Sequence, residues 1–99
     1  MSLRIKVNQN QIAEFCRRHH ISRLAFFGSV LRDDFTNQSD VDVLVEFEPG
    51  HVPGLEFIAM QGELGDLLGR PVDLHTPNSL SPYFRTRVLA EAEEQYVKT

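Results

Sequence analysis

The chain has 99 residues, 41% of them hydrophobic and 24% charged, which is the composition of one folded domain rather than of a disordered or fibrous protein. Ten basic residues against fourteen acidic ones give a formal net charge of −4, which disfavours direct binding of nucleic acid through phosphate neutralisation. No apolar stretch approaches the roughly 20 residues of a membrane span, no export signal is visible, and the single Cys16 cannot form an internal disulfide, so we expect a cytoplasmic protein.

The first half of the chain predicts a helix followed by two strands. The helix begins behind an asparagine cap, Asn8 or Asn10, and ends in the basic cluster 17–20. Its apolar residues recur at helical spacing: Ile12, Phe15 and Cys16. The apolar run 24–27 predicts a buried strand, and the alternation of apolar and polar residues over 41–47 predicts a second one.

The second half predicts a helix, a short strand and a last helix. Apolar residues at helical intervals indicate a helix over 55–68, with Gly69 placed to end it, and 72–74 reads as a strand. Ser81 is a helix cap followed by proline. The apolar stripe of the last helix comprises Phe84, Val88, Leu89, Ala92 and Tyr96. This order predicts a single α/β domain over residues 1–99, with one mixed sheet flanked by helices.

The segment that follows the first strand has the outline of a phosphate site. Gly28 stands where the buried strand stops, and a glycine there lets the backbone approach a ligand closely. Ser29 offers a hydroxyl and the N–H groups of a helical turn. Arg32, three residues later, lies on the same side of such a turn and can pair with a phosphate oxygen.

Three aspartates on strands predict a cation site. Asp40 and Asp42 are two residues apart, so both side chains leave the same face of their strand. At a separation of about 7 Å two carboxylates repel by about 0.6 kcal/mol in water and by more within a protein. A divalent cation turns this repulsion into attraction, and carboxylate oxygens suit Mg²⁺. If the strand of Asp73 lies beside that of Asp42, all three converge, and such a trio can hold two metal ions.

At these residues the sequence resembles the minimal nucleotidyltransferase family of the DNA polymerase β-like superfamily. The family signature is Gly-Ser, about ten residues, Asp-x-Asp between apolar residues, and a third Asp on a later strand. In this chain it reads Gly28-Ser29, Asp40-Val41-Asp42 and then Asp73, and the likeness extends over nearly the whole chain. One departure is Asp33, where the family more often has glycine.

The resemblance implies the nucleotidyltransferase fold and a specific activity. Small proteins of this kind are typically antitoxins that pair with a HEPN-domain ribonuclease toxin, and better-understood members transfer AMP from ATP to a tyrosine of the toxin. By this analogy Asp40 and Asp42 ligate two Mg²⁺ ions, Asp73 holds the catalytic one and is a candidate base, and Ser29 binds the triphosphate. The partner would then itself be the acceptor, which suits a chain too small for a substrate-recognition domain.

Two other functions stay open at this point. The chain could neutralise its toxin by binding alone with an idle site, which an acidic Asp33 beside the phosphates would favour. It could instead modify a small molecule or an RNA end, against which the negative charge and the lack of a second domain argue. A homodimer and a hetero-oligomer with the toxin are both compatible with the sequence. Two histidines near the motifs, His51 in a loop and His75 at a strand end, could each line the site, and the sequence favours a surface position for both.

Overall fold

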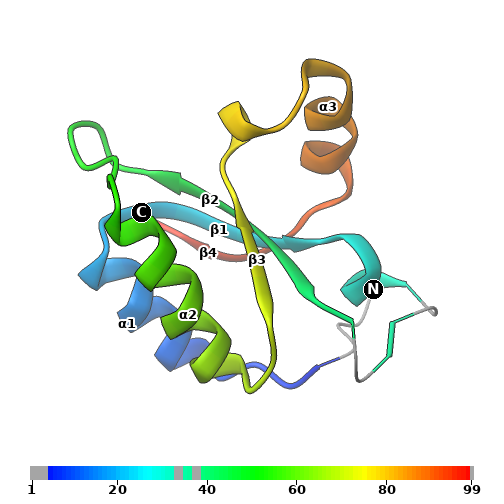
Figure 1. Cartoon of the computed structure of the whole chain (residues 1–99), viewed down its shortest axis with the longest axis horizontal. Helices are drawn as coiled ribbons and strands as arrows, with labels where there is room; N and C mark the ends of the chain where they lie inside the picture. Colours follow the sequence, from blue (N-terminus) through cyan, green and yellow to red (C-terminus); the bar gives the residue numbers. More distant parts are fainter. Residues whose placement is uncertain (1–4, 33–34, 37–38, 99) are drawn as a thin grey trace.

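A four-stranded mixed sheet with helices on both faces forms the domain, in a computed structural model that describes residues 5–32, 35–36 and 39–98 (Figure 1). The elements in chain order are α1 (Gln9–Arg18), β1 (Ile21–Phe27), the 3₁₀ turn η1 (Gly28–Leu31), β2 (Val41–Phe47), α2 (Glu56–Leu68), β3 (Val72–His75), the 3₁₀ turn η2 (Pro77–Ser79), α3 (Pro82–Glu91) and β4 (Glu93–Val97). The predicted α/β class is confirmed. Among the described residues, no helix is long and apolar enough to cross a bilayer.

The strand order is β3-β2-β1-β4, in which β2 and β3 run parallel and β1 is antiparallel to both of its neighbours. Helices α1 and α2 lie side by side over one face of the sheet, and α3 lies on the other side (Figure 1). β3 is therefore an edge strand, four residues long. Its free edge is partly satisfied by α2, because the Gln61 side-chain oxygen accepts a hydrogen bond from the Leu74 N–H at 2.9 Å.

The helix ends follow the capping residues that the sequence offers. The Asn8 side chain accepts a hydrogen bond from the Gln11 N–H at 3.1 Å, so Asn8 rather than Asn10 begins α1. Gly69 ends α2 in the left-handed conformation, with φ of +73°. Ser81 caps α3 through the Phe84 N–H.

Both faces of the sheet bury apolar side chains. The larger core lies under α1 and α2 and includes every second residue of β2, Val41, Val43 and Val45. Cys16 belongs to this core as a fully buried small hydrophobe, and burial raises the pKa of its thiol to about 12. A smaller cluster on the opposite face comprises Phe27, Leu44, Leu80 and Val88. The face of β2 that carries Asp42 is thus also partly apolar.

The prediction of a last helix reaching Tyr96 was wrong. α3 ends at Glu91, Ala92 turns into extended backbone with ψ of 137°, and the following residues form β4 against β1. Of the expected stripe, only Val88 and Ala92 pack in the smaller cluster, whereas Phe84 and Leu89 remain 45% and 40% exposed, so helical spacing overstated the length of the packing face. Strand formation instead satisfies the otherwise open edge of β1 and packs Tyr96 against the larger core.

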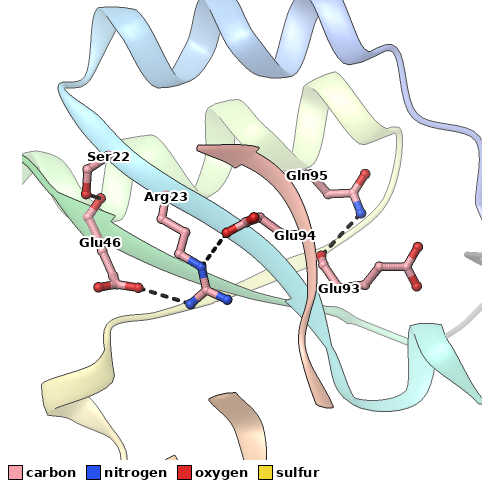
Figure 2. A network of polar contacts seen from close by, with 6 residues as sticks. All are labelled: Ser22, Arg23, Glu46, Glu93, Glu94 and Gln95. Atoms are coloured by element: carbon pink, nitrogen blue, oxygen red, sulfur yellow. Dashed lines mark hydrogen bonds and ion pairs between the residues drawn. The ribbon is translucent and has the colours of Figure 1, made fainter. Parts of the chain in front are cut away.

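Arg23 on β1 links the strands on both of its sides (Figure 2). Its Nε donates to Glu94 of β4 at 2.8 Å and its Nη1 to Glu46 of β2 at 3.1 Å. The hydrogen bond that Arg23 donates to Glu94 is the main reason that the pKa of Arg23 is raised. The Arg23 side chain is 25% exposed, so water screens these pairs less than it screens a fully exposed pair.

We expect Arg23→Met to lower the free energy of unfolding by about 1 kcal/mol, because the variant keeps the apolar stem but leaves two carboxylates without their shared cation. For a domain of this size such a loss lowers the melting temperature by about 4–8 °C. Arg87→Met is the matched control: Arg87 only approaches Glu91 at 4.0 Å on an exposed helix face, where a pair contributes about 0.3 kcal/mol. Equal melting temperatures for the two variants would contradict this account of β4 attachment.

Candidate active site

Asp42 and Asp73 are brought together by the parallel pairing of β2 and β3. The two residues are direct partners in the register. Val41 and Val43 point into the larger core, so Asp42 leaves the opposite face, and Asp73 does so between Val72 and Leu74 of β3. The prediction that these two strands are neighbours is confirmed. Their pairing places both carboxylates on one face of the sheet, directly opposite each other.

His75 joins this pair, so of the two positions that the sequence left open for it, the less favoured one, at the site, is found. Its Nε2 lies 3.3 Å from Asp73 Oδ2 and 3.7 Å from Asp42 Oδ1, and its side chain is only 25% exposed. The ring packs edge-on against Phe27, with the ring centroids 5.4 Å apart. The signal that could have found His75 is its period-two spacing from Asp73, which puts both side chains on the same strand face.

Gly28, the first residue of η1, follows directly after β1 and borders the site next to Asp42. Its φ is +79°, a region that side chains with a Cβ rarely adopt. A Cβ at this position would overlap the Asp42 carboxylate, with the nearest contact to Oδ2. The glycine therefore serves two purposes: it turns the chain at the end of β1, and it leaves room for a carboxylate that another strand supplies.

The pKa of Asp42 is raised, chiefly because partial burial removes water from its charged form. The charge and hydrogen bond of His75 oppose this shift, and the charges of Asp73 and Asp40 add to it. Several negative groups are thus held near one another on a partly desolvated face. Such an arrangement costs stability and is typical of a site that receives a positive ligand.

The other predicted site residues lie around this trio rather than within it. Asp40 is exposed and precedes β2, outside the group of ligand atoms that lie within 4.8 Å of one another. Ser29 lies half-buried in η1, and its carbonyl accepts the Arg32 N–H at 2.9 Å. Arg32 is exposed and lines a pocket of about 330 Å³ together with Gly28, Leu31 and Glu91. Asp33 lies outside the described residues.

The family profile described as "Nucleotidyltransferase domain" matches residues 9–94, which include every element from α1 to the start of β4. The chain belongs to the nucleotidyltransferase domain family. The resemblance seen in its Gly-Ser and Asp-x-Asp motifs is thereby confirmed.

Relatives of this nucleotidyltransferase carry related names. It is 38% identical over 79 residues to the protein adenylyltransferase MntA of Thermococcus cleftensis, covering 79% of this chain and 78% of that one. It is 36% identical over 84 residues to a Methanocaldococcus jannaschii protein, MJ0435, named provisionally as a protein adenylyltransferase, covering 85% and 89% of the two chains.

Solved structures support the same fold. One, described provisionally as a minimal nucleotidyltransferase, superposes with a TM-score of 0.71 at 37% identity, covering 85% of each chain. A crystal structure of a toxin–antitoxin with AMP-PNP superposes with a TM-score of 0.75 over 94% of this chain and 76% of that one. Because the two sequences are only 20% identical, this similarity supports the fold and no shared activity.

The donors in this nucleotidyltransferase fit a divalent cation. Asp42, Asp73 and His75 each offer one ligand atom, and these atoms all lie within 4.8 Å of one another. Two carboxylate oxygens and an imidazole nitrogen are ordinary ligands of divalent metal ions. A larger cavity of about 580 Å³ lies between α2 and β3, but Val72, which lines it, faces away from the carboxylates. The candidate cation site is therefore the group of donors on β2 and β3 and not this cavity.

Proposed function

We propose that this nucleotidyltransferase transfers AMP from ATP to a tyrosine of a partner protein, and that the partner is a HEPN-domain toxin which this modification silences. The observation that carries the proposal is the in-register Asp42–Asp73 pair beside Gly28, in a chain related to protein adenylyltransferases. Structural neighbours of the same fold include a MNT antitoxin in complex with a tri-AMPylated HEPN toxin of Shewanella oneidensis. Residues 1–99 would act as one minimal nucleotidyltransferase domain.

The proposed roles follow from position and charge. Asp42 and Asp73 would hold a divalent cation, with Asp40 contributing negative charge at the same end of β2. When bound, a divalent cation neutralises phosphate charge and favours ionisation of an attacking hydroxyl. Gly28 and Ser29 would let the triphosphate approach the backbone, and Arg32 would pair with a phosphate oxygen.

The transfer itself needs a base and a leaving group. The tyrosine oxygen forms a bond to the α-phosphorus of ATP, the bond from that phosphorus to the bridging oxygen breaks, and pyrophosphate leaves. Because a tyrosine hydroxyl has a pKa near 10, it is a weak nucleophile at neutral pH, and Asp73 is our candidate to accept its proton. Asp73 suits this role because its side chain is 55% exposed and open to an incoming acceptor.

The test is intact mass spectrometry of the protein encoded by the neighbouring gene, after incubation with the chain, ATP and Mg²⁺. The expected result is a mass gain of one or more AMP units, lost with Asp42→Asn and retained with Asp66→Asn, which alters an exposed aspartate of α2 outside the trio. An unchanged mass together with a stable complex would reject the transfer and indicate neutralisation by binding.

A further inference from the structure

His75 gives the carboxylate site a nitrogen donor that the Asp-x-Asp pattern alone does not predict. It stands two residues after Asp73 on β3 and in register with Leu44 on β2, on the same sheet face as both carboxylates. Of the groups of His, Cys, Asp and Glu among the described residues, this trio is the one whose ligand atoms gather closely enough to hold an ion.

The separations within the trio match those of ligands that share one ion. Two ligand atoms each about 2.1 Å from an ion lie about 3.0 Å apart at a right angle and about 4.2 Å apart on opposite sides. The His75 Nε2 distances of 3.3 Å to Asp73 and 3.7 Å to Asp42 fall within this range. Nε2 hydrogen-bonds to Asp42 when no ion is bound, and it presents a lone pair to an ion once the imidazole carries its proton on Nδ1 instead.

The position of the ring is fixed by packing. Phe27 contacts it edge-on at 5.4 Å between centroids, and three quarters of the His75 side-chain surface is buried. Little ordering is left to be done when an ion binds, so the nitrogen is preorganised.

The identity of the donor has a chemical consequence. Mg²⁺ prefers oxygen ligands and binds imidazole weakly, whereas first-row transition ions such as Mn²⁺ accept mixed nitrogen and oxygen ligands. We infer that His75 is a direct ligand of the cation at this site and shifts its preference from Mg²⁺ toward Mn²⁺ and related transition ions. This inference rests on the proposed function for the site but concerns the cation alone.

The experiment titrates Mn²⁺ into the full chain without ATP or partner. The electron paramagnetic resonance signal of free Mn²⁺ gives the affinity, and competition gives the Mg²⁺ affinity. Electron spin echo envelope modulation from ¹⁴N at the bound Mn²⁺ shows whether an imidazole nitrogen is coordinated. We expect a ¹⁴N coupling in the parent chain that is lost in His75→Val, and an Mn²⁺ affinity that falls at least about tenfold in this variant while the Mg²⁺ affinity changes much less. Valine suits the strand position.

Two controls complete the design. His51→Gln removes a histidine outside the trio, so it should bind both ions like the parent chain. His75→Asp, an all-carboxylate set, should reverse the preference in favour of Mg²⁺. Equal losses of both ions in His75→Val would mean that His75 only orients the carboxylates, and would overturn the inference, as would a ¹⁴N coupling that is lost in His51→Gln instead of His75→Val. Should His75→Val fail to fold, the parent chain and His51→Gln decide: a ¹⁴N coupling present in both supports the inference, and its absence from the parent chain overturns it. Because no ATP or partner is present, failure of AMP transfer leaves this result standing.

Discussion

Asp42→Asn is expected to reduce AMP transfer at least about 10³-fold, since it removes a negative ligand from a site that works by charge stabilisation. The same substitution should make the folded domain more stable at neutral pH. Asp42 is partly desolvated and faces Asp73, and both effects disfavour its ionised form. Asparagine has nearly the same shape and no charge, so it removes that cost together with the function.

The pH dependence of this stability change follows from the direction of the pKa shift. Because folding raises the pKa of Asp42, its favourable contribution is present in acid, below the ordinary aspartate pKa, and is lost as the pH rises through the raised folded value. The difference in unfolding free energy between Asp42→Asn and the parent chain should therefore be largest at neutral pH and vanish in acid. Denaturant titrations at several pH values measure this. A variant less stable than the parent at pH 7 would contradict the assigned desolvation.

Gly28→Ala is expected to lower AMP transfer by about 10²-fold and the unfolding free energy by about 2–3 kcal/mol. About 1 kcal/mol comes from placing a Cβ at φ of +79°, and the remainder from overlap with the Asp42 carboxylate. The loss of activity arises because Asp42 must move away, and displacements of about 1 Å can cost a factor of about 10² in rate.

Gly50→Ala separates these two effects. Gly50 has nearly the same φ, +81°, but a Cβ there would meet none of the described atoms within 4 Å. We expect this variant to lose only the backbone contribution, about 1 kcal/mol, and to transfer AMP at the parent rate. Transfer assays and thermal melts on the two variants provide the comparison. If Gly28→Ala and Gly50→Ala behave alike, Gly28 has no special relation to the carboxylate.

The parts of the fold that the sequence predicted are those fixed by local chemistry. Asn8, Gly69 and Ser81 end or begin helices because each satisfies backbone groups within one turn. β4 could not be predicted in this way, because its stability comes from pairing with β1, about 70 residues earlier in the chain, as in the Arg23–Glu94 contact. Local periodicity carries no information about such a partner.

The same distinction applies to the site. The alternation of apolar and polar residues within β2 predicts that the Asp42 side chain points away from the larger core. Its proximity to Asp73 follows once β3 is placed beside β2. The role of His75 depends on the exact register of two strands and on the ring of Phe27, which a single sequence does not specify. Asp40 lies outside the close trio, and the functional roles of all three aspartates remain predictions.

The edge position of β3 couples ion binding at the site to the local stability of the sheet. Two of the three donors, Asp73 and His75, lie on this four-residue strand. Its backbone is hydrogen-bonded to one neighbouring strand and to one glutamine side chain. An ion bound by both Asp42 and Asp73 would cross-link β2 and β3. At a concentration 100 times its dissociation constant, such an ion would stabilise the paired strands by about 2.7 kcal/mol. Local opening of β3 would then require release of the ion, so the free cation concentration would set how often β3 detaches from β2.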